Sequence, residues 1–344
     1  MSDNNEFQTK ISAPGAMSLM EAAELIKKGE IVAFPTETVY GLGANCFDAS
    51  AIAKIFKAKG RPSDNPLIVH VHSVEQVEKL SFNVTSVARE LMQKFWPGPL
   101  TLVLKKVPEV PDIVTGGLDT VAIRMPDHKV AQVIIEHAGV PVAAPSANLS
   151  GKPSPTNAQM VYDDLNGKIP LIIDSGPCEV GIESTVIDVT NNVPKILRPG
   201  MVTMEMINEA IGSVKLISGE SKKVRSPGIK YEHYKPDAEI TIVKGPQAAV
   251  ARHILFRIHE DEAEGKKSGV ICFEQTKRNY TGNIISLGSR FNLKEVAKNL
   301  YSALRQTDEL GLDTVYAEAL GEENEGLAIM NRLMRAANHK VEEI

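Results

Sequence analysis

The sequence predicts an α/β protein with two domains. Hydrophobic residues make up 43% and charged residues 24% of the 344-residue chain, both close to the averages of globular proteins. Such a chain has enough apolar surface to offset the entropy lost on folding. The length corresponds to about two domains of roughly 150 residues. Short apolar runs alternate with amphipathic stretches, as strands alternate with helices in α/β folds.

The first domain is expected over residues 1–212 and carries six short apolar runs that predict strands. These runs are Ile31–Phe34, Leu67–Val69, Leu100–Leu104, Val121–Ile123, Val142–Ala144 and Leu171–Ile173. Residues 18–28 and 49–57 have apolar residues at helical spacing, with Ser18 and Asp48 as candidate N-caps. Some connections are too short for a crossover helix, so the sheet is expected to be mixed.

The second domain is expected over residues 238–344, after a linker or ordered arm at 213–237. The linker contains GESKKVRSPGIKYEHYKP and has no apolar periodicity. Strands are predicted at Glu239–Val243, Gly269–Phe273, Asn283–Ile285 and Thr314–Ala317, and helices at Gln247–Ile258, Leu293–Leu304 and Gly326–Ala337. Strands that alternate with helices in this way predict a parallel sheet.

Charge and composition narrow the class of protein. The net charge of −5 argues against a basic nucleic-acid clamp, so any RNA binding is expected to be weak and local. No apolar run approaches the ~20 residues that cross a bilayer, and the start MSDNNEFQTK does not resemble a signal peptide. We therefore expect a cytoplasmic protein without membrane contact. Three widely spaced cysteines argue against a disulfide framework and against a structural zinc site.

Several common catalytic motifs are absent from the sequence. It contains no GxxxxGK[ST], GxGxxG, HExxH or GxSxG, so a nucleotide site, if present, is not a P-loop or a Rossmann fingerprint. His70 and His72 are two residues apart on a predicted strand, but no carboxylate or cysteine partner lies nearby in the sequence. A polar role at a strand end is therefore the better interpretation than a metal site.

Polar segments follow the predicted strands of the first domain. Residues 34–44 run from an apolar strand into hydroxyls, a carboxylate and glycines, and residues 144–155 contain hydroxyls, an amide, glycine and lysine. Ligands of α/β sheets collect at the carboxyl ends of strands, so both segments are candidate binding loops. The alternatives are an ordinary capped turn and a Ser/Pro/Gly surface loop.

Cations in three further segments suggest anion binding. Lys59 and Arg61 precede a proline-bounded loop, and an extended backbone there would aim both at a polyphosphate. A solvated run of charges is the alternative. Arg124 ends a strand and suits either a carboxylate or a surface salt bridge, Arg198 follows another apolar run, and Glu183–Asp188 places hydroxyls before a strand.

Taken together, these motifs resemble one family. PTETVYGLG, KAKGRPSDNPL, PGPLTLVL, DTVAIRMPDH, APSANLSGKPSPT, ESTVIDV and ILRPG occur in this order, and they closely resemble the YrdC-like threonylcarbamoyl-AMP synthases. The linker and the following α/β region resemble the longer, two-domain branch of the family. The resemblance implies a twisted, open mixed sheet with a concave, positively charged cavity, followed by a smaller Rossmann-like domain.

The resemblance also implies an activity and its partners. L-threonine, bicarbonate and ATP would give threonylcarbamoyl-AMP and pyrophosphate, in a nucleotidyltransferase reaction. The product would pass to separate threonylcarbamoyl transferase proteins that modify the adenosine next to the anticodon in tRNAs reading A-starting codons. Mg²⁺ would accompany ATP, held mainly by phosphates and water, and no protein ligand is assigned to it.

Site residues follow from the resemblance, position by position. Lys59 and Arg61 match the family's K-x-R pair and are the candidate catalytic residues, and Ser146 with Asn148 matches its S-x-N pair. The residues expected to bind threonine are Thr38, His70, Arg124, Ala144 and Ser184. The residues expected to bind ATP are Arg61, Asn65, Thr120, Ser146, Asn148, Ser154, Arg198 and Tyr234.

The linker departs from the common family form SPGMKYRHYAP. Ile229, Glu232 and Lys235 replace Met, Arg and Ala, whereas Tyr231, His233 and Tyr234 persist, so a nucleotide contact by Tyr234 is still expected.

Two other functions have less support from the sequence. A nucleic-acid-binding module would normally carry basic motifs interleaved with aromatics, which are missing. A carbamoyl-transfer enzyme of hydrogenase maturation would carry acylphosphatase-like and zinc-finger portions, and neither is visible.

Overall fold

The computed structural model describes residues 7–217 and 234–344, which form two units. The first unit holds the residues up to Ser150, together with Ser154–Glu179 and the described residues from Glu183 to 217. The second holds Gly151–Pro153, Val180–Ile182 and the residues from Tyr234 onward. The linker residues 218–233, with Tyr231 and His233, lie outside the described residues.

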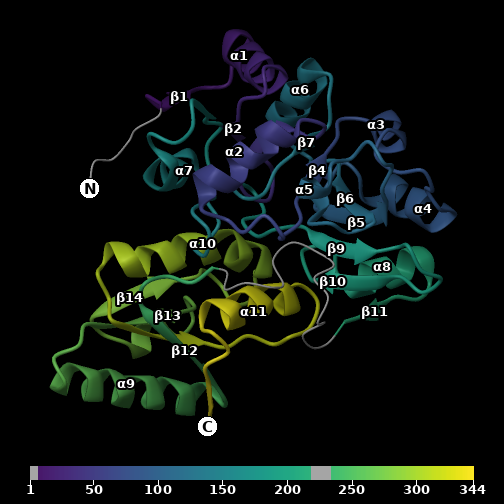
Figure 1. Cartoon of the computed structure of the whole chain (residues 1–344). Coiled ribbons are helices and arrows are strands. Elements are labelled where there is room, and N and C mark those ends of the chain that lie inside the picture. The colour runs from purple at the N-terminus through teal and green to yellow at the C-terminus, as the bar shows by residue number, and fades with distance from the viewer. Residues whose placement is uncertain (1–6, 218–233) are drawn as a thin grey trace. The chain divides into compact units, whose positions relative to one another are not determined.

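An eleven-stranded mixed sheet forms the first unit, in the order β1-β8-β2-β3-β7-β4-β6-β5-β9-β10-β11 (Figure 1). Neighbours β2 and β3 are antiparallel, whereas β4 and β6 are parallel, so the mixed sheet is confirmed. The strands are β1 Lys10–Ser12, β2 Val32–Phe34, β3 Gly41–Asn45, β4 Ile68–His70, β5 Leu100–Lys105, β6 Thr120–Arg124, β7 Val142–Ala143, β8 Leu171–Ile173, β9 Thr185–Asp188, β10 Lys195–Arg198 and β11 Lys215–Leu216. All six strands predicted from apolar runs are confirmed, and β9 lies where hydroxyls were expected to precede a strand. The strands β1, β3, β10 and β11 were not predicted, because they are short or contain glycine and polar residues.

Helices cover the two faces of this sheet unequally. One face packs on α1 (Ala16–Lys27) and α6 (Lys129–Ala138), which bury apolar residues against β2, β7 and β8. The larger core lies on the other face and includes apolar residues of α2 (Ala49–Lys59) and α4 (Ser86–Phe95). The remaining helices are α3 Val74–Glu78, α5 Asp112–Thr115, α7 Ala158–Leu165 and α8 Met204–Ile211.

The two predicted N-caps had different outcomes. Asp48 caps α2 as predicted, because its Oδ1 accepts hydrogen bonds from the backbone N–H groups of Ser50 at 2.9 Å and Ala51 at 3.1 Å. Ser18 does not cap α1. The N-cap is Gly15, and Ser18 lies inside the first turn, where its Oγ accepts a hydrogen bond from Gly15 N–H at 3.0 Å. The helix therefore begins earlier than the apolar spacing predicts.

Five strands of the second unit form the predicted parallel sheet, in the order β14-β13-β15-β12-β16. They are β12 Glu239–Lys244, β13 Ser268–Cys272, β14 Asn283–Ser286, β15 Thr314–Glu318 and β16 Val341–Glu343. Figure 1 shows α9 (Gln247–Ala263) on one face, with α10 (Leu293–Glu309) and α11 (Glu325–Ala336) on the other. The sequence did not predict β16, because it combines one apolar residue with acidic ones.

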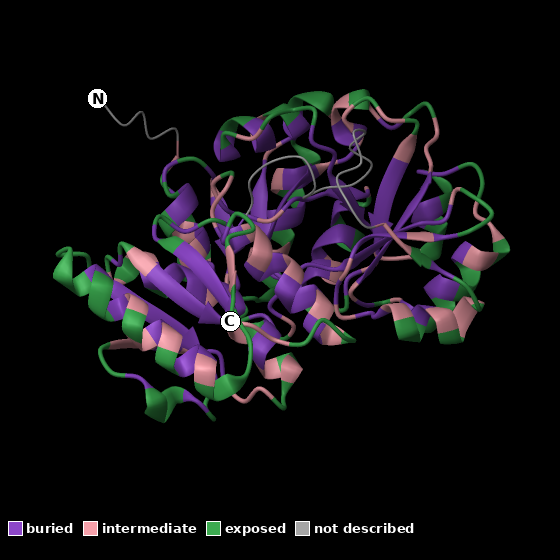
Figure 2. Cartoon of the chain, turned by 90° about the horizontal axis from the view of Figure 1, so that it is seen from below, coloured by how far each residue is buried: buried purple, intermediate pink, exposed green. Residues whose placement is uncertain are grey.

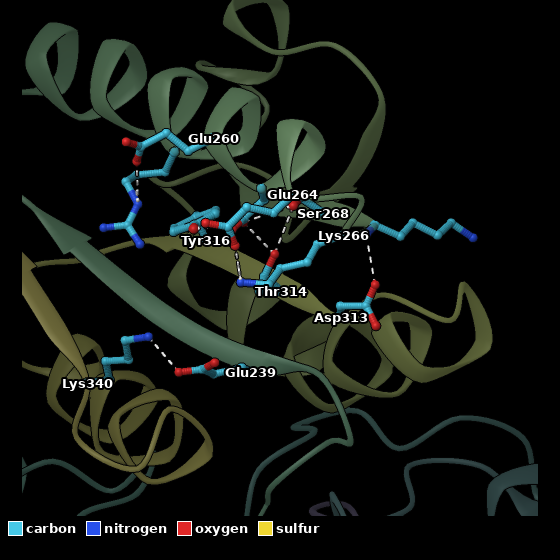
Figure 3. Close-up of polar contacts among 12 residues, drawn as sticks. Glu239, Glu260, Glu264, Lys266, Ser268, Asp313, Thr314, Tyr316 and Lys340 are labelled. Carbon is cyan, nitrogen blue, oxygen red and sulfur yellow. Dashed lines mark hydrogen bonds and ion pairs between the residues drawn. The ribbon is translucent and has the colours of Figure 1, made fainter.

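A buried carboxylate joins the end of α9 to this sheet. Asp261 Oδ2 accepts hydrogen bonds from Thr314 Oγ1 at 2.6 Å, Tyr316 OH at 2.8 Å and Ser268 Oγ at 2.9 Å. Figure 3 labels these three donor residues. Burial raises the pKa of Asp261, but these hydrogen bonds and the charge of Lys266 outweigh burial, and the pKa is lowered. The carboxylate therefore stays ionised near neutral pH.

Burial follows the layered architecture of each unit. Figure 2 shows the strands buried and the outer faces of the helices exposed. Among the described residues, no helix combines the length and apolar character that a membrane span requires. Cys46, Cys178 and Cys272 are all buried free thiols.

Candidate functional site

Strand alternation places four polar side chains on one face of the first sheet. His70 and Arg124 are register partners on β4 and β6, and they share a face with the apolar Ile68 and Ala122 two residues earlier. On the neighbouring strands, Thr101 of β5 pairs with Val186 of β9, and Ser184 lies two residues before Val186 on the same face. The four polar residues are therefore His70, Thr101, Arg124 and Ser184, and each is at most 4% exposed.

Arg124 is the central cation of this face. Its Nε donates to Gly98 O at 3.2 Å, and its NH1 donates to Thr38 Oγ1 at 2.8 Å. Its NH2 lies 2.5 Å from Glu37 Oε2, in an ion pair whose side chains are 4% and 6% exposed. Arg124 is thus neither a surface cation nor a free one. Three contacts fix its guanidinium plane, as recognition of a planar carboxylate requires.

Two histidines and one cysteine around Arg124 have pKa values shifted toward their neutral forms. Burial and the charge of Arg124 lower the pKa of His70 to about 3, so this imidazole is uncharged at neutral pH. Burial lowers the pKa of His128, although the charges of Glu37, Glu179 and Asp127 oppose the shift. Burial and the charge of Glu37 raise the pKa of the Cys178 thiol to about 12. None of these three groups therefore adds a charge beside the Arg124–Glu37 ion pair.

Ser184 connects the candidate threonine and nucleotide residues. Its Oγ lies 2.7 Å from Thr101 Oγ1, and Arg198 NH2 donates to the same Oγ at 3.3 Å. Arg198 Nε also donates to Ser184 O at 3.1 Å, which holds this guanidinium against the end of β9. Arg198 is only 6% exposed, so its charge lies in a low-dielectric environment, where the two hydrogen bonds to Ser184 fix its position.

Lys59 differs from the extended-loop geometry expected from the sequence. It is the last residue of α2, and its side chain is buried rather than solvated. Its Nζ donates to Ser146 O and to Asn148 O, each at 2.5 Å, and Ser146 Oγ donates to Asn148 Oδ1 at 2.5 Å. The K-x-R lysine and the S-x-N pair therefore meet. The helix ends beyond Lys59 because Gly60 takes a left-handed conformation, with φ of 62°.

Backbone pairing joins the two candidate binding loops. Leu42 N–H donates to Pro145 O at 2.9 Å, and Ala147 N–H donates to Tyr40 O at 2.8 Å. Tyr40 N–H donates further along the second loop, to Pro155 O at 2.9 Å. The loop with Thr38 and the loop with Ser146 and Asn148 are therefore held as one structure.

The remaining predicted residues are less closely connected. Arg61 NH2 donates to Pro66 O at 3.2 Å, Ser154 Oγ donates to Glu183 Oε1 at 2.6 Å, and Ala144 N–H donates to Ile68 O at 2.9 Å. Asn65 is 1% exposed. Thr120 begins β6 and pairs with Lys105, so it lies about 13 Å along the strand from Arg124.

Tyr234 belongs to the second unit. Its ring stacks on that of Tyr301, with the ring centroids 5.2 Å apart and an angle of 29° between the planes. Its backbone is left-handed, with φ of 66°, a conformation that is rare for a residue with a large side chain. The surrounding structure therefore holds this residue in place.

Three residues of this cluster were not among the predicted ones. Glu37 forms an ion pair with Arg124, and its charge acts on the pKa of His128. Thr101 forms a hydrogen bond with Ser184. Glu37 and His128 occur inside quoted motifs, but no spacing in the sequence indicates that they meet. Thr101 could have been found, because it interrupts an otherwise apolar strand at an inward position.

The site offers cations and hydrogen-bond donors rather than metal ligands or a nucleophile. Within residues 7–217 and 234–344, no three or more His, Cys, Asp and Glu side chains gather as a metal site would require. What this arrangement can do is hold two anions close together.

Comparison with known families covers nearly the whole chain. Residues 24–200 match the family described as "Telomere recombination", and residues 202–338 match "Threonylcarbamoyl-AMP synthase, C-terminal domain". The threonylcarbamoyl-AMP synthase of Pyrococcus abyssi is 48% identical over 327 residues, which cover 93% of this chain and 94% of the relative. That of Bacillus subtilis is 47% identical and covers 94% of each chain.

Solved structures agree with these matches. P. abyssi Sua5 complexed with L-threonine is similar with a TM-score of 0.92 and 45% identity, over 98% of this chain and 99% of the other. A variant of P. abyssi Sua5, with one histidine and one tyrosine replaced by alanine, matches with the same TM-score and identity, over 98% of both chains. The expected α/β fold with a second parallel-sheet domain is therefore confirmed.

Proposed function

The chain belongs to the threonylcarbamoyl-AMP synthase family, and we propose that it joins L-threonine, bicarbonate and ATP to give threonylcarbamoyl-AMP and pyrophosphate. The observation that carries this proposal is the buried guanidinium of Arg124, held by Thr38 and Glu37 on the same sheet face as Ser184. Because Ser184 in turn contacts Arg198, an amino-acid subsite and a nucleotide subsite would adjoin. Adjacent subsites are what a reaction between the two substrates needs.

In the threonine subsite, Arg124 binds the carboxylate of the amino acid. Its NH1 keeps one N–H beyond the hydrogen bond to Thr38, and its NH2 has no hydrogen-bond partner among the described residues, so both nitrogens keep donors for a planar anion. His70, neutral because of burial and the charge of Arg124, adds a hydrogen bond without adding charge, and Ser184 and the backbone near Ala144 complete the subsite. A relative of the same architecture, P. abyssi Sua5, has been solved with L-threonine.

In the nucleotide subsite, Arg61 and Arg198 bind ATP and Lys59 supports the phosphates. Ser146 and Asn148 contact Lys59 and supply neutral groups, and Asn65 and Ser154 are assigned to ATP on the resemblance. Thr120 and Tyr234 are assigned to ATP as well, on the resemblance alone. Mg²⁺ would arrive with ATP as part of that substrate, held mainly by phosphates and water, and no residue of the chain is assigned to it.

The chemistry requires no protein nucleophile. The amine of threonine adds to CO₂ derived from bicarbonate, and the resulting N-carboxylate attacks the α-phosphorus of ATP as pyrophosphate leaves. The residues of this chain hold two mutually repelling anions in line and stabilise the charge that develops on pyrophosphate. Lys59, Arg61 and Arg198 serve the second task.

The product is passed on to tRNA-modifying threonylcarbamoyl transferase proteins. Threonylcarbamoyl-AMP is a mixed anhydride, and its acyl group becomes attached to the adenosine next to the anticodon of tRNAs that read A-starting codons. The net charge of −5 supports a role confined to making this intermediate, with at most weak RNA binding by the chain itself.

One incubation tests the proposal. The protein is mixed with ATP–Mg²⁺, bicarbonate and L-threonine without RNA, and the products are separated for mass detection. We expect threonylcarbamoyl-AMP and an equal amount of pyrophosphate, both dependent on threonine. Pyrophosphate that forms without threonine, or no adenylate at all, would contradict the assignment. Isotope-labelled bicarbonate should appear in the acyl group of the product.

A further inference from the structure

We propose that Glu37 binds the α-ammonium group of the amino-acid substrate and thereby makes the site selective for amino acids over hydroxy acids of the same shape. The inference rests on the proposed function and extends it, because it assigns a specificity-determining residue that the family motifs do not distinguish from their neighbours. It follows from the contacts and the burial of the Glu37 carboxylate.

The Glu37 carboxylate is buried with incomplete hydrogen bonding. The residue is 5% exposed, and its Oε2 lies 2.5 Å from Arg124 NH2. Its Oε1 has no hydrogen-bond partner among the described residues, and Oε2 faces Arg124 without being aligned for a hydrogen bond. A carboxylate removed from water costs several kcal/mol unless donors reach its oxygens. A bound ammonium group would supply these donors.

The charges around Glu37 are complementary to an amino-acid zwitterion. Arg124 and Glu37 place one cation and one anion side by side, and a zwitterion carries the same two charges in the same proximity. The other titratable groups nearby do not disturb this pattern. Burial keeps His70 and His128 neutral and Cys178 protonated, as the directions of their pKa shifts indicate, and Glu179 is exposed.

His128 is a second buried polar group near the Glu37 carboxylate. Its Nδ1 is buried and has no hydrogen-bond partner within the described part of the chain, and the charge of Glu37 acts on this ring. Buried polar atoms of native proteins are nearly always paired, so these unpaired atoms around one carboxylate indicate a place for a donor group. A site built for an N–H donor rejects a ligand without it far more strongly than an apolar pocket rejects a shape.

The test compares two ligands on the full chain by titration calorimetry. L-threonine and (2S,3R)-2,3-dihydroxybutanoate have the same shape, but the second has a hydroxyl in place of the ammonium group. Wild-type protein should bind threonine about 10–100-fold more tightly, as expected for one charge-assisted hydrogen bond. In Glu37→Gln the affinity for threonine should fall by that factor, whereas binding of the hydroxy acid changes about threefold or less.

Glu179→Gln is the matched control, because it removes an exposed carboxylate from the same neighbourhood and should keep the wild-type preference. Three outcomes would overturn the proposal: threonine binding to Glu37→Gln at wild-type strength or tighter, equal losses for both ligands, or a wild-type protein without preference. Equal losses would mean that Glu37 only positions Arg124. If Glu37→Gln does not fold, the proposal is tested by whether the wild-type protein binds threonine more tightly than the hydroxy acid. Failure of the wild type to bind threonine at all would instead contradict the proposed function.

Discussion

At the scale of single residues, burial decides what each cation can do. Lys59 is 2% exposed, and its ammonium group donates to two backbone carbonyls of the 146–148 segment. It also lies at the carboxyl end of α2, where the helix dipole favours a positive charge. Lys59 therefore fixes the loop that carries Ser146 and Asn148, whatever charge it also supplies in the proposed reaction.

Replacement of Lys59 should slow turnover strongly. In Lys59→Met, both the charge and the hold on the loop are lost while most of the volume remains, and we expect kcat to fall about 100-fold or more. Pyrophosphate release at saturating substrates measures the loss. Lys57→Met removes an exposed lysine of the same helix and should keep activity within about twofold. Equal turnover of both variants would demote Lys59 to a structural residue.

The Arg124–Glu37 pair supports a double-mutant prediction. Arg124→Met should weaken threonine binding by about 2–4 kcal/mol, because a charge-assisted contact is lost. It should also lower the free energy of unfolding by about 3–5 kcal/mol, because Glu37 is left buried without its cation. Adding Glu37→Gln should recover part of the stability but none of the binding. Denaturant titration and calorimetry measure the two effects, and additive losses in stability would mean that the two residues are not coupled.

At the scale of elements, close packing of β3 leaves no space for a side chain at Gly43. A Cβ there would lie 2.5 Å from Phe34 Cε1 on β2 and 2.7 Å from Val142 Cγ1 on β7. Both neighbours belong to the core that packs on α1 and α6. The glycine in this strand therefore lets three strands of the sheet pack together.

Gly43→Ala should therefore destabilise the first unit by about 1–3 kcal/mol through overpacking. The matched control is Gly15→Ala, since a Cβ at Gly15 would approach no atom more closely than Ser18 Oγ at 3.9 Å. Urea unfolding followed by tryptophan fluorescence measures both variants. A loss in Gly43→Ala no larger than in Gly15→Ala would show that the sheet relaxes around the added methyl group.

In the second unit, the Asp261 cluster ties α9 to β13 and β15. In the full chain, Asp261→Asn should lower the hydrogen-exchange protection of amides in these elements by about 2–3 kcal/mol at pH 7. The reason is that hydrogen bonds to a charged acceptor are lost. The folded pKa is lowered, so this stabilisation is present above the unfolded pKa of about 3.9 and is lost as pH falls through the folded value.

Hydrogen exchange of α9 and β13 amides at several pH values measures this effect. The difference between wild type and Asp261→Asn should be constant at neutral pH and should shrink below about pH 4. A difference that grows as the pH falls would contradict the assigned direction of the pKa shift. Glu264→Gln, an exposed change close to the same helix end, should show little effect at any pH.

At the scale of the whole molecule, the chain carries a built-in reporter of its first unit. Trp96 is the single tryptophan, and its Nε1 donates to Leu100 O at 2.7 Å, at the start of β5. Its fluorescence therefore follows unfolding of the sheet that bears Arg124. Signals from the second unit need another probe, because two units need not unfold in one transition.

Threonine should stabilise this first unit by mass action. At a concentration 100 times its Kd, a ligand that binds only the folded state adds about 2.7 kcal/mol to the free energy of unfolding. The urea midpoint from Trp96 fluorescence should therefore rise with threonine concentration in the wild type, and rise much less in Arg124→Met. An unmoved midpoint at concentrations that support turnover would place the threonine site outside this unit.

Local sequence signals determined the elements and the motifs of this protein. Apolar runs predicted six strands of the first sheet and four of the second, because a strand buried in a sheet is encoded by a short run of apolar residues. Helical spacing located α2, α9, α10 and α11, although Gly15, not Ser18, caps α1. Short strands such as β1 and β16 carry too few apolar residues to be recognised.

Which side chains meet was decided by the tertiary structure alone. Arg124 bonds Thr38 from 86 residues away, and Lys59 bonds Asn148 from 89 residues away. Strand order and register, not local propensity, bring these residues together. The motifs therefore indicated candidate site residues but not the contacts between them. The pairing of Glu37 with Arg124 needed the structure for the same reason, since a buried ion pair exists only where packing excludes water from both partners.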